Sequence, residues 1–127
     1  MEDLIKWDGC DAVINLGIMG RRHLVSRLTD SIRKSDPTCS ADLLESVNKM
    51  LNDFEIKYVN HIVKLMEQHQ KPVVGVYMVK DEKDLSVHPV DGGKYKGVFF
   101  PTPEQAVKSL AKMYEYHQFL ERENRSA

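Results

Sequence analysis

A glycine-framed turn followed by two arginines is the first feature of the sequence that could do chemistry. Gly17 and Gly20 enclose two residues, and Arg21 and Arg22 follow directly. The turn comes after an apolar segment and before a segment with helical periodicity, so we place it between a strand and a helix. Glycines let a backbone approach an anion, and a helix N-terminus carries about half a positive charge. We therefore predict that Gly17, Gly20 and Arg21 lie near a bound phosphate; a plain tight turn with two solvated arginines is the alternative.

Other patterns with known chemistry are missing from the sequence. The glycine turn matches neither the GxxxxGK[ST] phosphate loop nor the GxGxxG dinucleotide fingerprint. No HExxH occurs, no His–Cys pair has the spacing of zinc ligands, and no GxSxG is present. Cys10 precedes an apolar segment, and no base is placed to activate its thiol. The sequence therefore predicts no catalytic residue and no metal ligand among its five histidines, which are His23, His61, His69, His88 and His117.

A short charged run follows the second apolar segment of the chain. It consists of Asp81, Glu82, Lys83 and Asp84. Two interpretations are open: the run is a solvated loop, or it binds a cation or a cationic group at the carboxyl edge of the sheet.

Apolar periodicity predicts the elements that position these residues. Two segments are apolar at consecutive positions, which is typical of buried parallel strands. Thr102, Pro103 and Gln105 form the N-terminal signal of a helix: a cap, a proline at the first helical position and a capping box. Strands that alternate with helices predict an α/β fold with a parallel sheet. The expected strands cover 11–18, 73–79 and 97–100, the expected helices cover 21–34, 41–69 (with a kink at 52–53) and 103–121, and 80–95 is an expected loop.

Composition limits the class of protein. The chain has 127 residues, which is one domain or part of one, and its net charge is −1 from 18 Lys+Arg and 19 Asp+Glu. This balance argues against a general nucleic-acid binder, which usually has a basic excess. No apolar run approaches the ~20 residues of a membrane span, no signal peptide is recognisable, and two cysteines make no disulfide framework. We therefore expect a cytoplasmic protein that binds neither nucleic acid nor membrane.

Two stretches resemble a known family. They are KPVVGV at 71–76 and GVFFPTPEQAV at 97–107, the latter followed by Leu110-Ala111 and by YHQFLER at 116–122. Together they resemble the C-terminal part of the flavodoxin-like ligase-CoA domain of NDP-forming acyl-CoA synthetases, to which succinyl-CoA synthetases are related. The resemblance extends over about 7–122 and is most specific in 72–79 and 97–111.

The resemblance implies a fold and a chemistry. It implies a three-layer flavodoxin-like fold. Residues 1–127 would form part of such a domain, with about three parallel strands. Such enzymes convert an acid, CoA and ATP into acyl-CoA, ADP and phosphate (GTP and GDP in some), through an acyl phosphate and a phosphohistidine. CoA, ATP/ADP and Mg would thus act in the full enzyme, with Gly17, Gly20 and Arg21 near the phosphate or CoA. The remaining domains or subunits of the synthetase would be partners of this chain.

The sequence departs from that family in ways that limit the chain. No histidine lies in a phosphohistidine loop, no ATP-grasp region is present, and the first strand–helix–strand unit of the domain would precede Met1. We therefore expect a fragment or small paralogue that is not catalytic alone. A non-catalytic flavodoxin-like binding or oligomerisation module is the alternative. The strand at 11–18 would have an open apolar edge, so we expect a homo-oligomer that covers this edge or the Met-rich face of the long helix.

Overall fold

The computed structural model describes residues 1–127 and folds them into four helices and one four-stranded sheet. None of the helices combines the length and the apolar character that a membrane span needs. The helices are α1 (Glu2–Lys6), α2 (Arg21–Ser35), α3 (Ala41–His69) and α4 (Pro103–Ser126). The strands are β1 (Val13–Leu16), β2 (Val73–Val76), β3 (Val87–His88) and β4 (Gly97–Phe100).

The sheet is mixed, with the strand order β1-β2-β4-β3. The pairs β1–β2 and β2–β4 are parallel, whereas β3 pairs antiparallel with β4, with His88 opposite Gly97. The α/β class is therefore confirmed, and the three expected strands form the parallel part of the sheet, but the expectation of a purely parallel sheet is wrong, because the segment 80–95, expected to be a loop throughout, contains β3. β3 and β4 are joined by a short connection, which suits antiparallel pairing, while a parallel pair needs a long crossover. β1 lies at an edge of the sheet, as expected.

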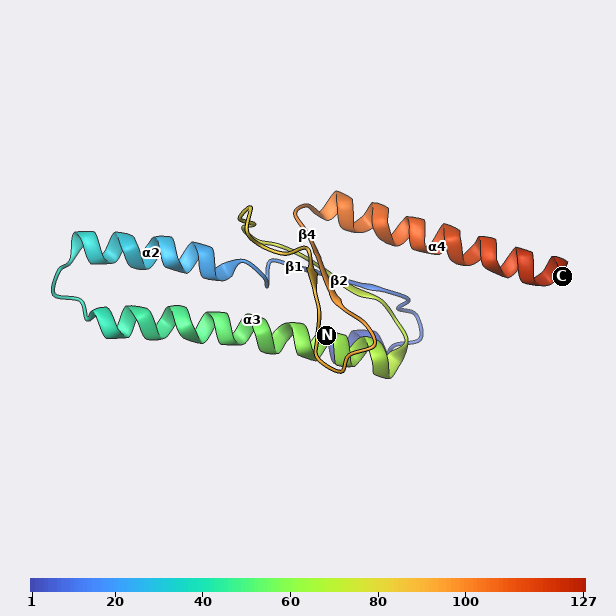
Figure 1. Ribbon diagram of the computed structural model, residues 1–127, viewed down its shortest axis with the longest axis horizontal. Helices are drawn as coiled ribbons and strands as arrows, with labels where there is room; N and C mark the ends of the chain where they lie inside the picture. Colours follow the sequence, from blue (N-terminus) through green and yellow to red (C-terminus); the bar gives the residue numbers. More distant parts are fainter.

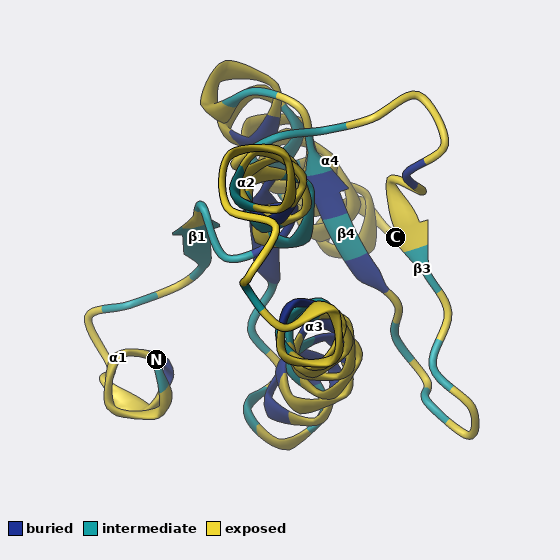
Figure 2. Ribbon diagram, turned by 90° about the vertical axis from the view of Figure 1, so that its left-hand side faces the viewer, coloured by how far each residue is buried: buried dark blue, intermediate teal, exposed yellow.

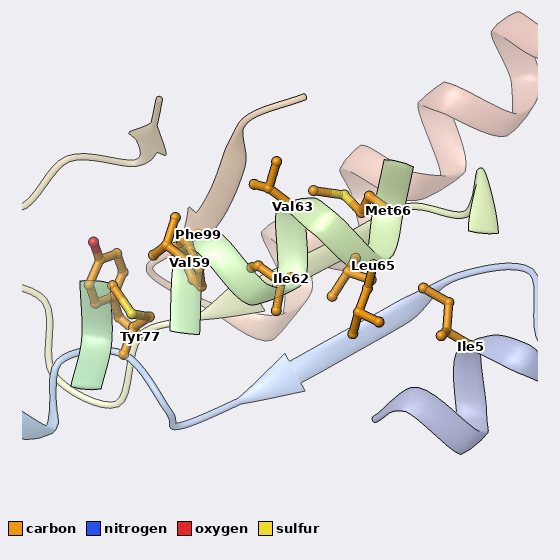
Figure 3. Close-up of a cluster of buried hydrophobic side chains, with 10 residues drawn as sticks. Ile5, Val59, Ile62, Val63, Leu65, Met66, Tyr77 and Phe99 are labelled. Atoms are coloured by element: carbon orange, nitrogen blue, oxygen red, sulfur yellow. The ribbon is translucent and has the colours of Figure 1, made fainter. Parts of the chain in front are cut away.

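The main hydrophobic core lies between α3 and one face of the sheet (Figure 3). Val59, Ile62 and Val63 of α3 pack in one cluster with Phe99 of β4, and Ile5 of α1 belongs to the same cluster. Val59, Ile62 and Val63 recur at helical spacing on α3, so one face of this long helix covers the sheet.

A smaller apolar cluster lies on the other face of the sheet, under α4. Ala106 is fully buried there against Val74 and Val76 of β2. Side chains of successive strand residues point to opposite faces, so β2 contributes to both clusters. The sheet is therefore covered by α3 on one face and by α4 on the other.

The long helices extend beyond the sheet in opposite directions (Figure 1). α2 and α3 lie side by side as an antiparallel pair on one side, while α4 extends to the other. The Ser40 hydroxyl caps α3 and the Thr102 hydroxyl caps α4, each accepting a backbone N–H at 3.3 Å. α3 is one helix through 52–53, and α4 continues to Ser126, five residues beyond the expected end. The outer parts of these helices are largely exposed (Figure 2).

Candidate functional site

Three charged side chains and one histidine meet at the carboxyl ends of β1 and β2. Arg22 and His23 come from the start of α2, Glu55 from the middle of α3, and Asp84 from the segment that follows β2. In open α/β sheets this edge is where ligands bind. It is also the edge at which the sequence places the glycine turn.

The carboxylate of Glu55 occupies the N-terminus of α2. Its Oε1 accepts the backbone N–H of Gly20 at 2.9 Å and that of Arg22 at 3.4 Å, and its Oε2 lies 2.8 Å from Arg22 Nη1. Glu55 is only 2% exposed. The first N–H groups of a helix have no partner within the helix and attract an anion. The chain therefore fills with its own carboxylate the place that the sequence predicts for a phosphate.

Asp84 is the second buried carboxylate of this network. It accepts hydrogen bonds from the Arg22 guanidinium, from the Asp81 backbone N–H at 2.9 Å, and from His23 Nε2 at 2.6 Å. Arg22 thus bridges two carboxylates that belong to different segments. Of the two interpretations of the acidic run, binding of a cationic group applies to Asp84, and the cation is the chain's own Arg22. Asp81 is solvent-exposed.

The pKa of Asp84 is lower than that of an ordinary aspartate. Burial by itself would raise this pKa, but the hydrogen bonds from Asp81 and His23 and the positive charges of Arg22 and His23 outweigh it. The charged carboxylate is therefore the form that the fold favours.

We expect acid to destabilise the protein through Asp84. A depressed native pKa contributes stability above the unfolded pKa of about 3.9, and that stability is lost as the pH falls through the lower native value. The free energy of unfolding, measured by urea denaturation, should fall as the pH is lowered below about 4, and Asp84→Asn should flatten this slope. An unchanged slope in Asp84→Asn would assign the acid sensitivity to other carboxylates.

A hydrogen-bonded tyrosine lies next to the charged network. The Tyr77 hydroxyl donates to the Leu85 carbonyl at 2.7 Å and lies 2.8 Å from His88 Nε2. Since the hydroxyl has a single proton, His88 Nε2 must be the donor in the second contact. Burial raises the pKa of Tyr77 to about 12, with the negative charge of Asp84 acting in the same direction. The phenol therefore stays protonated and holds the 77–88 segment in place.

The three residues of the predicted phosphate site lie together in the turn before α2. Gly17 and Gly20 both have positive φ, at 71° and 84°, and the Gly17 N–H donates to the Val76 carbonyl. Arg21 is exposed; its Nε donates to the Gly17 carbonyl at 2.8 Å and its guanidinium makes no ion pair. A phosphate bound to the Gly20 amide would have to displace Glu55. The role of Gly17, Gly20 and Arg21 in a phosphate or CoA site stays a prediction.

No family model matches this chain, and neither a curated protein nor a solved structure is significantly similar to it. The function must therefore be argued from the chain's own residues.

Sequence reasoning missed the charged network, although one signal was present. Glu55 stands between Leu51 and Val59 at helical spacing, on the face of α3 that is otherwise apolar. A charged residue at such a position is buried and needs a partner. No sequence pattern indicated that Asp84 and His23, which are 61 residues apart, would be in contact.

The network is saturated with internal contacts. Each carboxylate has at least two donors, and no group of His, Cys, Asp and Glu side chains is arranged to hold a metal ion. The Cys10 thiol donates to the Ala12 carbonyl at 3.4 Å. The charged network holds α2, α3 and the segment after β2 together at the carboxyl edge of the sheet. The Arg21 guanidinium lies beside this network and has no acidic partner.

Proposed function

We propose that this chain is a fragment or small paralogue of an NDP-forming acyl-CoA synthetase, and that it contributes to a phosphate or CoA site without being catalytic alone. One observation carries the proposal. The two stretches that resemble this family form β2, β4 and the start of α4, which are neighbours in space. A parallel strand pair followed by a helix on the sheet face is what a flavodoxin-like domain requires at these positions.

A phosphate or a CoA molecule, which that family binds, could contact only part of this site. The Gly20 and Arg22 amides are engaged with Glu55, so they form no open cradle for a phosphate. The exposed Arg21 guanidinium has no acidic partner and is the group of this turn that could contact an anion. Mg, the nucleotide and the phosphohistidine would be held by other domains or subunits, and no reaction step is assigned to this chain.

Titration with CoA and with inorganic phosphate tests the proposal. We expect either anion to shift the amide and guanidinium NMR signals of Arg21, and Arg21→Ala to abolish binding while the spectrum elsewhere stays native. Lys112→Ala is the matched control, because it removes a cation that lies on α4. Signals at Arg21 that respond to neither anion would contradict the proposed site.

The exposed surface favours the second candidate, a binding or oligomerisation module. The chain exposes 9045 Å², about 2,100 Å² more than the ~6,900 Å² typical of a compact monomer of this mass. A standard protein–protein interface buries about 800 Å² per partner, so the excess is large enough for one. Large exposed apolar side chains lie on all three long helices and on β1; they include Leu24, Leu28, Met50, Phe54, Tyr116, Phe119 and Leu16.

Light scattering at increasing protein concentration tests this second candidate. If the chain is a binding or oligomerisation module, we expect light scattering to show a dimer or higher oligomer. At the same protein concentrations, CoA should leave the NMR signals of Arg21 unchanged. A clean monomer at high concentration would exclude self-assembly through these helices and the β1 edge.

A further inference from the structure

A groove with no assigned role lies at the opposite end of the sheet from the charged network. It has a volume of about 550 Å³ and is bounded by the end of α3, the starts of β2 and β4, the middle of α4 and the segment before β4. Pockets for small molecules typically have about 300–1,000 Å³. The groove is therefore large enough for a small ligand, and it is independent of the Arg22 network.

The walls of the groove are predominantly apolar. Val74, Val98 and Phe100 of the sheet line it, with Met66 of α3 and Met113 of α4. Met113 is 54% exposed, so the apolar surface under α4 is partly open to solvent. Such a surface favours an unbranched apolar chain, and the two methionines can adapt their shape to it.

The rim of the groove is cationic. Lys71, Lys94 and Lys96 line it, and no aspartate or glutamate does. None of the three lysines makes an ion pair in the structure. The rim therefore presents three lysine ammonium groups, beside one carboxylate, that of Glu67, which accepts the Lys94 backbone N–H.

Two of the rim residues are held in place. Lys71 Nζ donates to the carbonyls of Ile5 and Trp7, at 2.9 Å each, which leaves one ammonium proton for a ligand. The Tyr95 hydroxyl donates to Gln70 at 2.9 Å and fixes the segment that carries the other two lysines to the end of α3. The positive charges thus stay beside the apolar walls.

We propose that this groove binds an amphiphilic anion, with a linear alkyl chain along the apolar walls and a carboxylate at the lysine rim. The charge complementarity of the rim selects an anionic head group, and the apolar walls favour an anion that carries an apolar chain over a small inorganic anion. The site does not depend on the proposed synthetase function, because it shares no residue with the Arg21 turn.

Calorimetric titration with decanoate tests the proposal. Decanoate should bind more tightly than 1-decanol and decyltrimethylammonium, which carry the same chain with a neutral or cationic head. The Lys94→Ala/Lys96→Ala double variant should weaken decanoate binding by about tenfold or more, since charge-assisted contacts are lost. Lys112→Ala, which removes a lysine of α4 outside the groove, should leave the affinity unchanged.

A blocking variant separates the groove from the exposed apolar surface of α4. Ser109 lines the groove from α4, and Ser109→Phe should fill it and abolish decanoate binding while the circular dichroism stays helical. Equal binding of the three probes, or unchanged decanoate binding in folded Ser109→Phe, would overturn the proposal.

Discussion

Arg22→Ala should lower the free energy of unfolding by about 3 kcal/mol, whereas Arg21→Ala should lower it by less than about 1 kcal/mol. Arg22 is the cation between Glu55 and Asp84, whose side chains are 2% and 3% exposed. Its removal leaves two buried carboxylates without their shared partner, which is far more costly than the loss of a surface contact. Arg21 is the matched control, because it is the neighbouring arginine and its side chain makes one hydrogen bond, to the Gly17 carbonyl.

Urea denaturation of both variants measures this difference, because a typical domain has about 5–15 kcal/mol of stability and remains folded after such a loss. A further variant tests the cause. Combining Arg22→Ala with Glu55→Gln and Asp84→Asn removes the uncompensated charges, and we expect it to be more stable than Arg22→Ala alone. Equal losses in Arg21→Ala and Arg22→Ala would show that the network contributes no more than a surface ion pair.

The elements of this fold could be predicted because their signals are local. The α3 stripe from Leu44 to Met66 repeats at helical spacing, and the Thr102-Pro103 signal marks the first residue of α4. β3 could not be found in this way, because two residues, Val87 and His88, give no periodic signal. Its pairing with β4 depends on tertiary contacts.

The candidate site was predictable only at its glycine turn. Gly17 and Gly20 are visible as a turn because glycine tolerates positive φ. The anion at that turn was not visible, since the carboxylate of Glu55 comes from 35 residues further along the chain. The sequence predicted a phosphate near this turn, which stays a prediction, and it did not indicate that the chain places its own carboxylate at the N-terminus of α2.

Gly20→Ala is the second substitution for which we expect a large effect, and Gly92→Ala is its matched control. Both glycines have left-handed backbone, with φ of 84° and 72°. An added Cβ at Gly20 would lie 2.1 Å from the Val79 carbonyl oxygen, whereas at Gly92 nothing lies within 4 Å. Gly92→Ala should therefore cost only the backbone strain, about 1–2 kcal/mol, and Gly20→Ala about 3–4 kcal/mol, because overpacking is added to it.

The larger loss at Gly20 should extend to the charged network. Relief of the clash requires the turn and Val79 to separate, and because the Gly20 N–H donates to Glu55 from this same turn, we expect that hydrogen bond to be disturbed. Urea denaturation of the two variants gives the free energies of unfolding, and the amide NMR signals of residue 20 and of Arg22 report the contact with Glu55. Equal destabilisation by the two substitutions would mean that the Val79 carbonyl yields freely, and that the close approach at Gly20 adds nothing to the backbone strain.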